Sequence, residues 1–225
     1  MGIEKINEVA ILKLKDEETI MSHRLAKSVA TYLLRENIIE NEDVETYIYG
    51  AEVLLSGILG IINILVVSVL MDSGNRGVLF LLIFIPIRMY IGGYHASSYL
   101  TCNICFILIY ILTTSVENYV GKWGLESILW ILVLIGLLII LKYAPLENIN
   151  KRIPQCKVNK YKMIGSSLYI GFMLIAMVLC TDIKQLDNSH VSVETGLYIN
   201  IILVTIVLLF VIGMRKEGKL DEKEN

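Results

Sequence analysis

Long apolar runs are the feature that most restricts how this chain can fold. A helix needs about 20 apolar residues to cross a hydrocarbon core of roughly 30 Å. Five runs approach or reach that length, each bounded by charged, Gly or Asn residues: 51–70, 99 or 100 to about 116, 125–141, 164–180 and 197–214. With 55% hydrophobic residues, the chain is also too apolar for a solvated surface. We therefore predict an all-α integral membrane protein.

A sixth run, at residues 78–90, allows two interpretations. It reads VLFLLIFIPIRMY, has only 13 residues and contains Pro86 and Arg88. It either crosses the membrane as a short, kinked helix whose Arg88 reaches the interface, or enters and leaves the membrane on one side. The distribution of Lys and Arg favours a full span, because these residues are retained in short cytoplasmic loops. Six spans with both termini inside place 17 of the 20 Lys and Arg on the cytoplasmic side, leaving outside only Arg76, Lys122 and Lys184.

The segments outside the spans define the expected organisation. Residues 1–49 form a charged region that fits no secretory signal, so we expect the N-terminus to be retained. Its apolar residues predict an amphipathic helix, either on the inner leaflet or packed on the other helices. Residues 50–214 would be the transmembrane domain and 215–225 a charged cytoplasmic tail. The apolar positions near helical spacing are Leu25, Val29, Tyr32, Leu33 and Ile38.

One of the four cysteines has an unusual context. Disulfides are not expected, because Cys102, Cys105 and Cys156 would lie in or beside reducing cytosol and Cys180 has no outer partner. A membrane cysteine is usually an inert apolar filler. Cys102 differs because His95 lies seven residues before it in IRMYIGGYHASSYLTCN.

The spacing of His95 and Cys102 requires a turn between them. On a continuous helix the two side chains would be about 10.5 Å apart along the axis, too far for a hydrogen bond. The pair Gly92–Gly93 permits a turn, and Ser97 or Ser98 can cap the helix that follows. Cys102 would then lie just past the first helical turn, where free N–H groups favour a thiolate and can bind an oxyanion. We predict a catalytic dyad of His95 as base and Cys102 as nucleophile.

Other pairings are weaker. Cys156 has basic neighbours but no nearby His, and Cys180 with His190 lacks a comparable turn. His23 fits a solvated residue of the charged N-terminal region. No metal or other cofactor is expected. The third member of a triad stays open among Asn63, Asn103, Glu40, Glu42 and Asp43.

The segment around the dyad resembles a known family. Arg88, Gly92–Gly93, His95-Ala96-Ser97-Ser98 and Cys102 are similar to the active segment of the AgrB family, the accessory gene regulator membrane peptidases of Gram-positive bacteria. The resemblance extends to chain size, the amphipathic N-terminus and a basic inner loop. The N-terminus is longer here than in the best-known members, and the loop has fewer contiguous basic residues. The loop residues concerned are Asn150, Lys151, Arg152 and Pro154, with Lys157 and Lys160 beyond them.

The resemblance implies a peptidase of the cell membrane that cleaves the C-terminal tail from a small AgrD-like pro-peptide. The active His and Cys of the family fall on His95 and Cys102, and Arg88 and Gly93 also fall on positions that the family uses. Attack by the Cys102 thiolate would give a thioester, which an internal Cys of the substrate can capture as a thiolactone if water is excluded. An internal Ser would give a lactone. The family also implies a homodimer, and nothing in the sequence indicates a nucleic-acid partner.

Some roles stay open on sequence alone. The basic loop is either a topology signal or a dock for an acidic peptide tail, and Arg88 either binds substrate or reaches the interface. The alternative function is a non-catalytic peptide transporter or a sensor. A transporter would usually have paired broken helices or ionisable groups deep in the membrane, whereas only Asn63 and Arg88 are candidates here. A sensor would need an output domain, for which the flanking regions are too short.

Overall fold

The structure is a computed structural model that describes residues 23–93, 99–146, 154–181 and 189–224. In these ranges the chain is helical, without any strand, which confirms the all-α prediction. Six of the described helices are long and apolar enough to cross a membrane. The chain divides into two compact units: residues 1–66 with 96–107, and residues 67–95 with 108–225. Helices α2 and α4 run from one unit into the other.

The first unit contains an N-terminal helical hairpin. Residues 23–35 are helical, and the short η1 (Asn41–Asp43) leads into α2 (Val44–Leu70). Asn37, in the left-handed conformation at φ 54°, ends the first helix, and Ile38 N–H donates to the Leu33 carbonyl at 3.0 Å. His23 Nδ1 lies 2.7 Å from Glu52 Oε1, which joins the first helix to α2. His23 is therefore exposed, as expected, but it is paired.

Two faces of the helix at 23–35 differ in burial. Ala26 and Ala30 are almost completely buried, while Leu25, Val29 and Tyr32 are exposed. The helix is thus packed through its small residues, as expected for a helix that packs on other helices. It also keeps an apolar face uncovered within the described part of the chain, as expected for a helix on a membrane leaflet.

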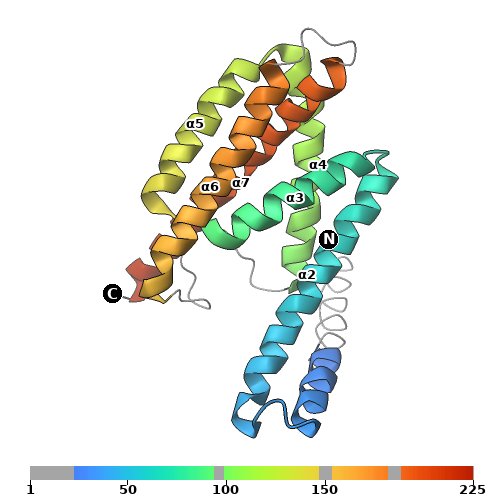
Figure 1. The fold of residues 1–225 in the computed structure, drawn as a ribbon, viewed down its shortest axis with the longest axis vertical. Coiled ribbons are helices and arrows are strands. Elements are labelled where there is room, and N and C mark those ends of the chain that lie inside the picture. The colour runs from blue at the N-terminus through green and yellow to red at the C-terminus, as the bar shows by residue number, and fades with distance from the viewer. Residues whose placement is uncertain (1–22, 94–98, 147–153, 182–188, 225) are drawn as a thin grey trace, which may run out of the picture. The chain divides into compact units, whose positions relative to one another are not determined.

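The second unit is built around α7 (Ser189–Glu224). This helix contacts α3 (Gly74–Ile91), α5 (Glu126–Tyr143) and α6 (Gln155–Thr181). Figure 1 shows α5, α6 and α7 side by side, with α3 lying at an oblique angle to α6 and α7. In the most apolar stretch of α7, 61% of the residues are buried, against 17–39% in the other spans. A helix that is apolar on all sides is expected at the centre of such a bundle.

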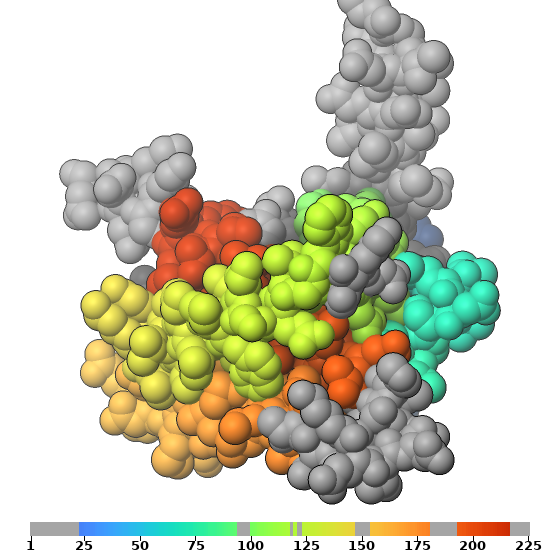
Figure 2. Space-filling view, turned by 90° about the horizontal axis from the view of Figure 1, so that it is seen from above, coloured from blue at the N-terminus to red at the C-terminus, as the bar shows by residue number. Residues whose placement is uncertain are grey.

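Glycines let the helices of this unit approach closely. A Cβ added to Gly136 of α5 would lie 2.5 Å from Val207 of α7, and one added to Gly165 of α6 would lie 2.7 Å from Ile91 of α3. Small residues at helix contacts are typical of membrane proteins, where van der Waals packing replaces the hydrophobic effect. In the space-filling view the surfaces of α5 (yellow) and α6 (orange) lie side by side (Figure 2).

The uncertain sixth run is part of a regular helix. Helix α3 has 18 residues, with Pro86 inside it, and is long enough to be a span by length and composition. The sequence interpretation began it at Val78, four residues too late. Helix α3 packs on α6 and α7, and its buried apolar residues recur at helical spacing: Phe80, Ile83, Phe84, Ile87 and Ile91.

Candidate active site

The predicted active segment follows the C-terminal end of α3. The N–H of Gly92 donates to the Arg88 carbonyl at 2.9 Å and closes the helix. Gly92 has φ 82° and Gly93 has φ 143°, a region of backbone space that favours glycine. The chain therefore leaves the helix here, as the expected turn requires. His95, Ser97 and Ser98 lie outside the described residues.

Arg88 lies against the end of its own helix. Its guanidinium carbon is 5.4 Å from the centroid of the Phe84 ring, and a Cβ added to Gly93 would lie 3.9 Å from the same carbon. The side chain is partly buried. Whether Arg88 binds substrate stays a prediction.

The segment that follows α5 docks on this same helix end. Leu146 N–H donates to the Ile91 carbonyl at 2.9 Å, so a carbonyl at the helix terminus gains a partner from outside the helix. This segment begins the basic loop that the sequence predicts to lie on the inner side. Lys151 and Arg152 lie outside the described residues, whereas Lys157 and Lys160 are exposed on the first turns of α6.

Cys102 belongs to the first unit. It is the fourth residue of α4 (Tyr99–Trp123), it is partly buried, and its thiol is free. Helix α4 begins at Tyr99, one of the two starting residues expected from the sequence. Cys102 therefore lies at the end of the first turn. His95 and Cys102 fall in different units, so the dyad stays a prediction. Among the other cysteines, Cys156 is exposed on α6, and Cys105 and Cys180 are partly buried.

The candidates for a third catalytic residue now differ in position. A Cβ added to Gly60 of α2 would lie 3.0 Å from Asn103 Oδ1, so α2 meets α4 directly beside Cys102. Glu42 and Asp43 precede the start of α2, and from Val44 to Gly60 the helix advances about 24 Å. Glu40 also precedes the start of α2. Asn63, less than one turn beyond Gly60, and Asn103 are therefore the nearer candidates.

Sequence reasoning missed a charged cluster in the second unit. Arg76, on the first turn of α3, has Nη2 2.6 Å from Glu117 Oε1 of α4 and 3.7 Å from Glu194 Oε2 of α7. The Arg76 guanidinium and the Glu117 carboxylate form an ion pair. Glu117 is 12% exposed and Glu194 is 64% exposed. Arg76 thus neutralises the nearly buried Glu117 carboxylate and makes a longer contact with the exposed Glu194.

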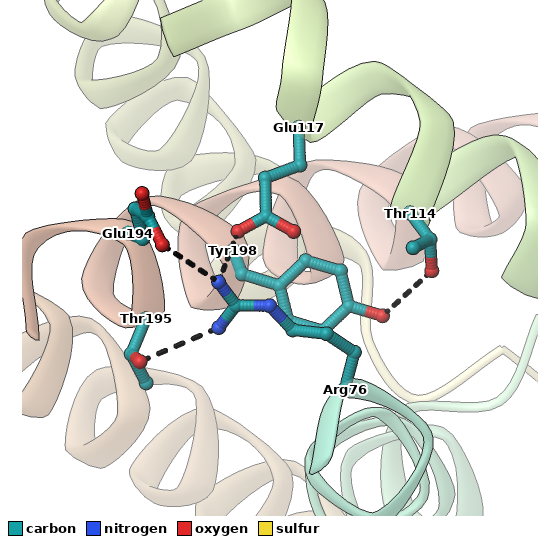
Figure 3. Close-up of polar contacts among 6 residues, drawn as sticks. All are labelled: Arg76, Thr114, Glu117, Glu194, Thr195 and Tyr198. Atoms are coloured by element: carbon teal, nitrogen blue, oxygen red, sulfur yellow. Dashed lines mark hydrogen bonds and ion pairs between the residues drawn. The ribbon is translucent and has the colours of Figure 1, made fainter. Parts of the chain in front are cut away.

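An aromatic ring and hydroxyl groups complete this cluster (Figure 3). The guanidinium carbon of Arg76 lies 5.1 Å from the centroid of the Tyr198 ring, within the range of a cation–π contact. Arg76 Nη1 also donates to the Thr195 hydroxyl at 3.3 Å. The Tyr198 hydroxyl lies 3.2 Å from that of Thr114. The cluster joins α3, α4 and α7, and the only sequence signal for it was an isolated Arg and Glu, each at one end of an apolar run.

The described residues contain no group of three His, Cys, Asp or Glu that could hold a metal ion. Of the predicted site residues, the described ones supply a thiol near a helix start, an arginine at a helix end and the lysines of α6.

The helices and their apolar surfaces define the class: a multi-pass, all-α membrane protein. The sequence profile of the family Accessory gene regulator B, AgrB, matches residues 26–214. The chain belongs to this family, which is consistent with a role in the agr quorum-sensing system.

Three relatives illustrate the range of similarity. An AgrB-like protein of Clostridium perfringens (strain SM101) is 26% identical over 168 residues, 71% of this chain and 78% of the relative. Accessory gene regulator protein B of Staphylococcus epidermidis is 27% identical over 171 residues, 74% of this chain and 84% of its own. The protein of that name in Staphylococcus saprophyticus is 32% identical over 105 residues, 47% of this chain and 54% of its own. No solved structure matches the chain.

Proposed function

We propose that this protein is a membrane-embedded cysteine endopeptidase that removes the C-terminal tail of an AgrD-like pro-peptide and promotes closure of a thiolactone or lactone ring. The observation that carries the proposal is the placement of Cys102 on the first turn of α4, after a Gly-Gly-x-His-Ala segment, in a member of the AgrB family. The product would be an autoinducing peptide for quorum sensing. The proposed location is the cell membrane of a Gram-positive bacterium, with the active site and both termini cytoplasmic.

In the proposed reaction the Cys102 thiolate attacks the scissile carbonyl carbon. The tetrahedral oxyanion is stabilised by free N–H groups at the start of α4. His95, carrying the proton taken from Cys102, donates it to the leaving amine as the C–N bond breaks, and the tail departs. A thioester joins the remaining peptide to Cys102.

The second half-reaction regenerates the enzyme. His95 takes the proton of an internal Cys thiol of the peptide, and the resulting thiolate attacks the thioester carbonyl. The new thioester closes the ring and the Cys102 sulfur leaves, to be reprotonated by His95. The exchange is close to isoenergetic, so the ring forms only if water is kept from the acyl-enzyme. A substrate Ser in that place would give a lactone.

Loss of cleavage in two variants tests the proposal. Co-expressed with an AgrD-like pro-peptide that has a central Cys and an acidic tail, Cys102→Ala and His95→Ala should each abolish release of the tail. Both should still insert in the membrane. Cys156→Ala and Cys180→Ala serve as matched controls and should cleave normally. Normal cleavage by Cys102→Ala would show that the nucleophile is wrong. Absence of cleavage by the wild-type protein would leave a non-catalytic transporter or sensor as the alternative. The expected homodimer is tested separately, by the mass of the purified protein in detergent.

A further inference from the structure

The end of α3 is joined to the basic inner loop by a backbone contact. The Ile91 carbonyl, at the last residue of the helix, accepts a hydrogen bond from Leu146 N–H at 2.9 Å. Ile91 is completely buried, and Ala144, two residues before Leu146, is 6% exposed. Leu146 itself is partly buried. A backbone hydrogen bond between residues far apart in the sequence, with its acceptor buried, fixes both segments locally. We refer to this contact of Ile91 and Gly92 with Leu146 as the seam.

Gly92 is adapted to the seam in two independent ways. Its φ of 82° favours a residue without a Cβ. A Cβ at this position would also lie 2.6 Å from the Leu146 carbonyl oxygen and 3.4 Å from the Leu146 nitrogen. Both atoms are backbone, which cannot turn aside as the end of a flexible side chain can. Any other residue at position 92 would therefore force the two segments apart.

Helix α6, which follows the basic loop in the sequence, packs against the same helix end. A Cβ added to Gly165 of α6 would lie 2.7 Å from the Ile91 side chain. The rings of Tyr90 and Tyr161 meet edge to face, with centroids 5.5 Å apart. Leu146, the last described residue before Lys151 and Arg152, and helix α6, which follows them in the sequence, therefore both contact the end of α3.

We propose that the seam is a positioning device for the proposed dyad: it fixes the point from which the chain to His95 departs by bonding it to Leu146. His95 follows Gly92 by three residues, so its Cα lies at most about 11 Å from the seam. A misplacement of about 1 Å can cost a reaction roughly 100-fold. Gly92 and Leu146 act through His95 and do not touch the substrate in this account. The inference rests on the proposed dyad.

Reactivity of the Cys102 thiol tests the seam without any peptide. The full chain with Cys105, Cys156 and Cys180 replaced by Ala is inserted in membranes, and the rate of Cys102 alkylation by iodoacetamide is measured near neutral pH. The first pair of variants is Gly92→Ala and Gly124→Ala. Gly124 also has positive φ, 63°, but a Cβ there would meet nothing within 4 Å. The pair thus separates the contact with Leu146 from backbone strain alone.

A second pair removes the hydrogen bond without altering Gly92. Leu146→Pro deletes the N–H donor, whereas Leu146→Ala keeps the backbone amide. If Gly92→Ala does not insert in the membrane, the comparison of Leu146→Pro with Leu146→Ala tests the seam by itself. Gly92→Ala and Leu146→Pro should each slow alkylation at least about tenfold, towards the rate of His95→Ala, since general-base assistance is worth 100-fold or more. Gly124→Ala and Leu146→Ala should stay within about twofold of the parent.

Two contrary results are distinguishable. If His95→Ala slows alkylation but Gly92→Ala and Leu146→Pro react as their controls do, the seam has no positioning role and the dyad stands. If His95→Ala reacts as fast as the parent, the proposed dyad is wrong and the inference falls with it.

Discussion

Arg76 and Glu117 form an ion pair that is largely shielded from solvent, outside the proposed active site. Glu117 is 12% exposed and Arg76 21% exposed, so each charge depends on the other for compensation. Removing one partner of a buried pair is costly because the other charge stays behind without water. Glu194, which is 64% exposed, has water as an alternative partner.

Substitutions in this cluster should therefore differ sharply in effect. Arg76→Ala should destabilise the protein by about 3 kcal/mol, measured by thermal unfolding in detergent, because it strands the Glu117 carboxylate. The double variant Arg76→Ala with Glu117→Gln should be more stable than Arg76→Ala alone, since it leaves no unpaired charge. Glu194→Gln is the matched control, with a cost below about 0.5 kcal/mol. Equal stability of Arg76→Ala and the wild type would show that the cluster contributes nothing.

At the scale of helices, hydrophobicity predicts the membrane part of each element but not its ends. Helix α6 starts at Gln155, nine residues before its apolar run, because exposed polar residues such as Lys157 continue the helix beyond the hydrocarbon. Helix α3 starts at Gly74, four residues before its apolar run, and the charge of Arg76 in its first turn is compensated by Glu117 of another helix. Such compensation depends on tertiary contacts that periodicity does not reveal.

The candidate site was predictable only where local chemistry determines it. The end of a helix at Gly92 and the start of another near Ser98 follow from glycine and capping preferences. The contact of Ile91 with Leu146 joins residues 55 positions apart, and no local pattern indicates it. The sequence therefore characterises the basic loop by its charge alone and does not reveal that Leu146, where the loop begins, is bonded to the end of α3.

The lysines at the start of α6 lead to a prediction for this element. Replacing Lys157 and Lys160, together with Lys151 and Arg152, by Gln should raise the KM for an acidic-tailed peptide more than it lowers kcat. Each lost attraction is worth about 1 kcal/mol or less and is screened over roughly 8 to 10 Å. Wild-type processing should also slow as salt rises.

The control for the loop variant removes positive charge elsewhere on the same predicted side. Lys219→Gln with Lys223→Gln should leave KM unchanged, and topology must be rechecked in both variants because Lys and Arg also orient the protein. If orientation holds and the loop variant processes an acidic-tailed peptide normally at low salt, the loop is only a topology signal. Docking would then be sought around Arg88 or the N-terminal hairpin.

At the scale of the whole molecule, six apolar helices and the placement of 17 of 20 Lys and Arg predict both termini inside. Single reporter cysteines in a cysteine-depleted background test this arrangement. An impermeant reagent applied from outside should label positions 122 and 184, and should not label position 157 in intact cells. Labelling at 157 from outside would contradict the six-span topology, and with it the cytoplasmic active site.

The central claim is that Cys102 carries the peptide as a thioester, and trapping that species tests it most directly. A pro-peptide whose internal Cys is replaced by Ala cannot close the ring, so the acyl-enzyme should accumulate. We predict that mass spectrometry finds the peptide attached to the fragment containing Cys102, that hydroxylamine releases it, and that Cys102→Ala forms no adduct. An adduct on Cys156, or release of the tail with no dependence on Cys102, would contradict the account.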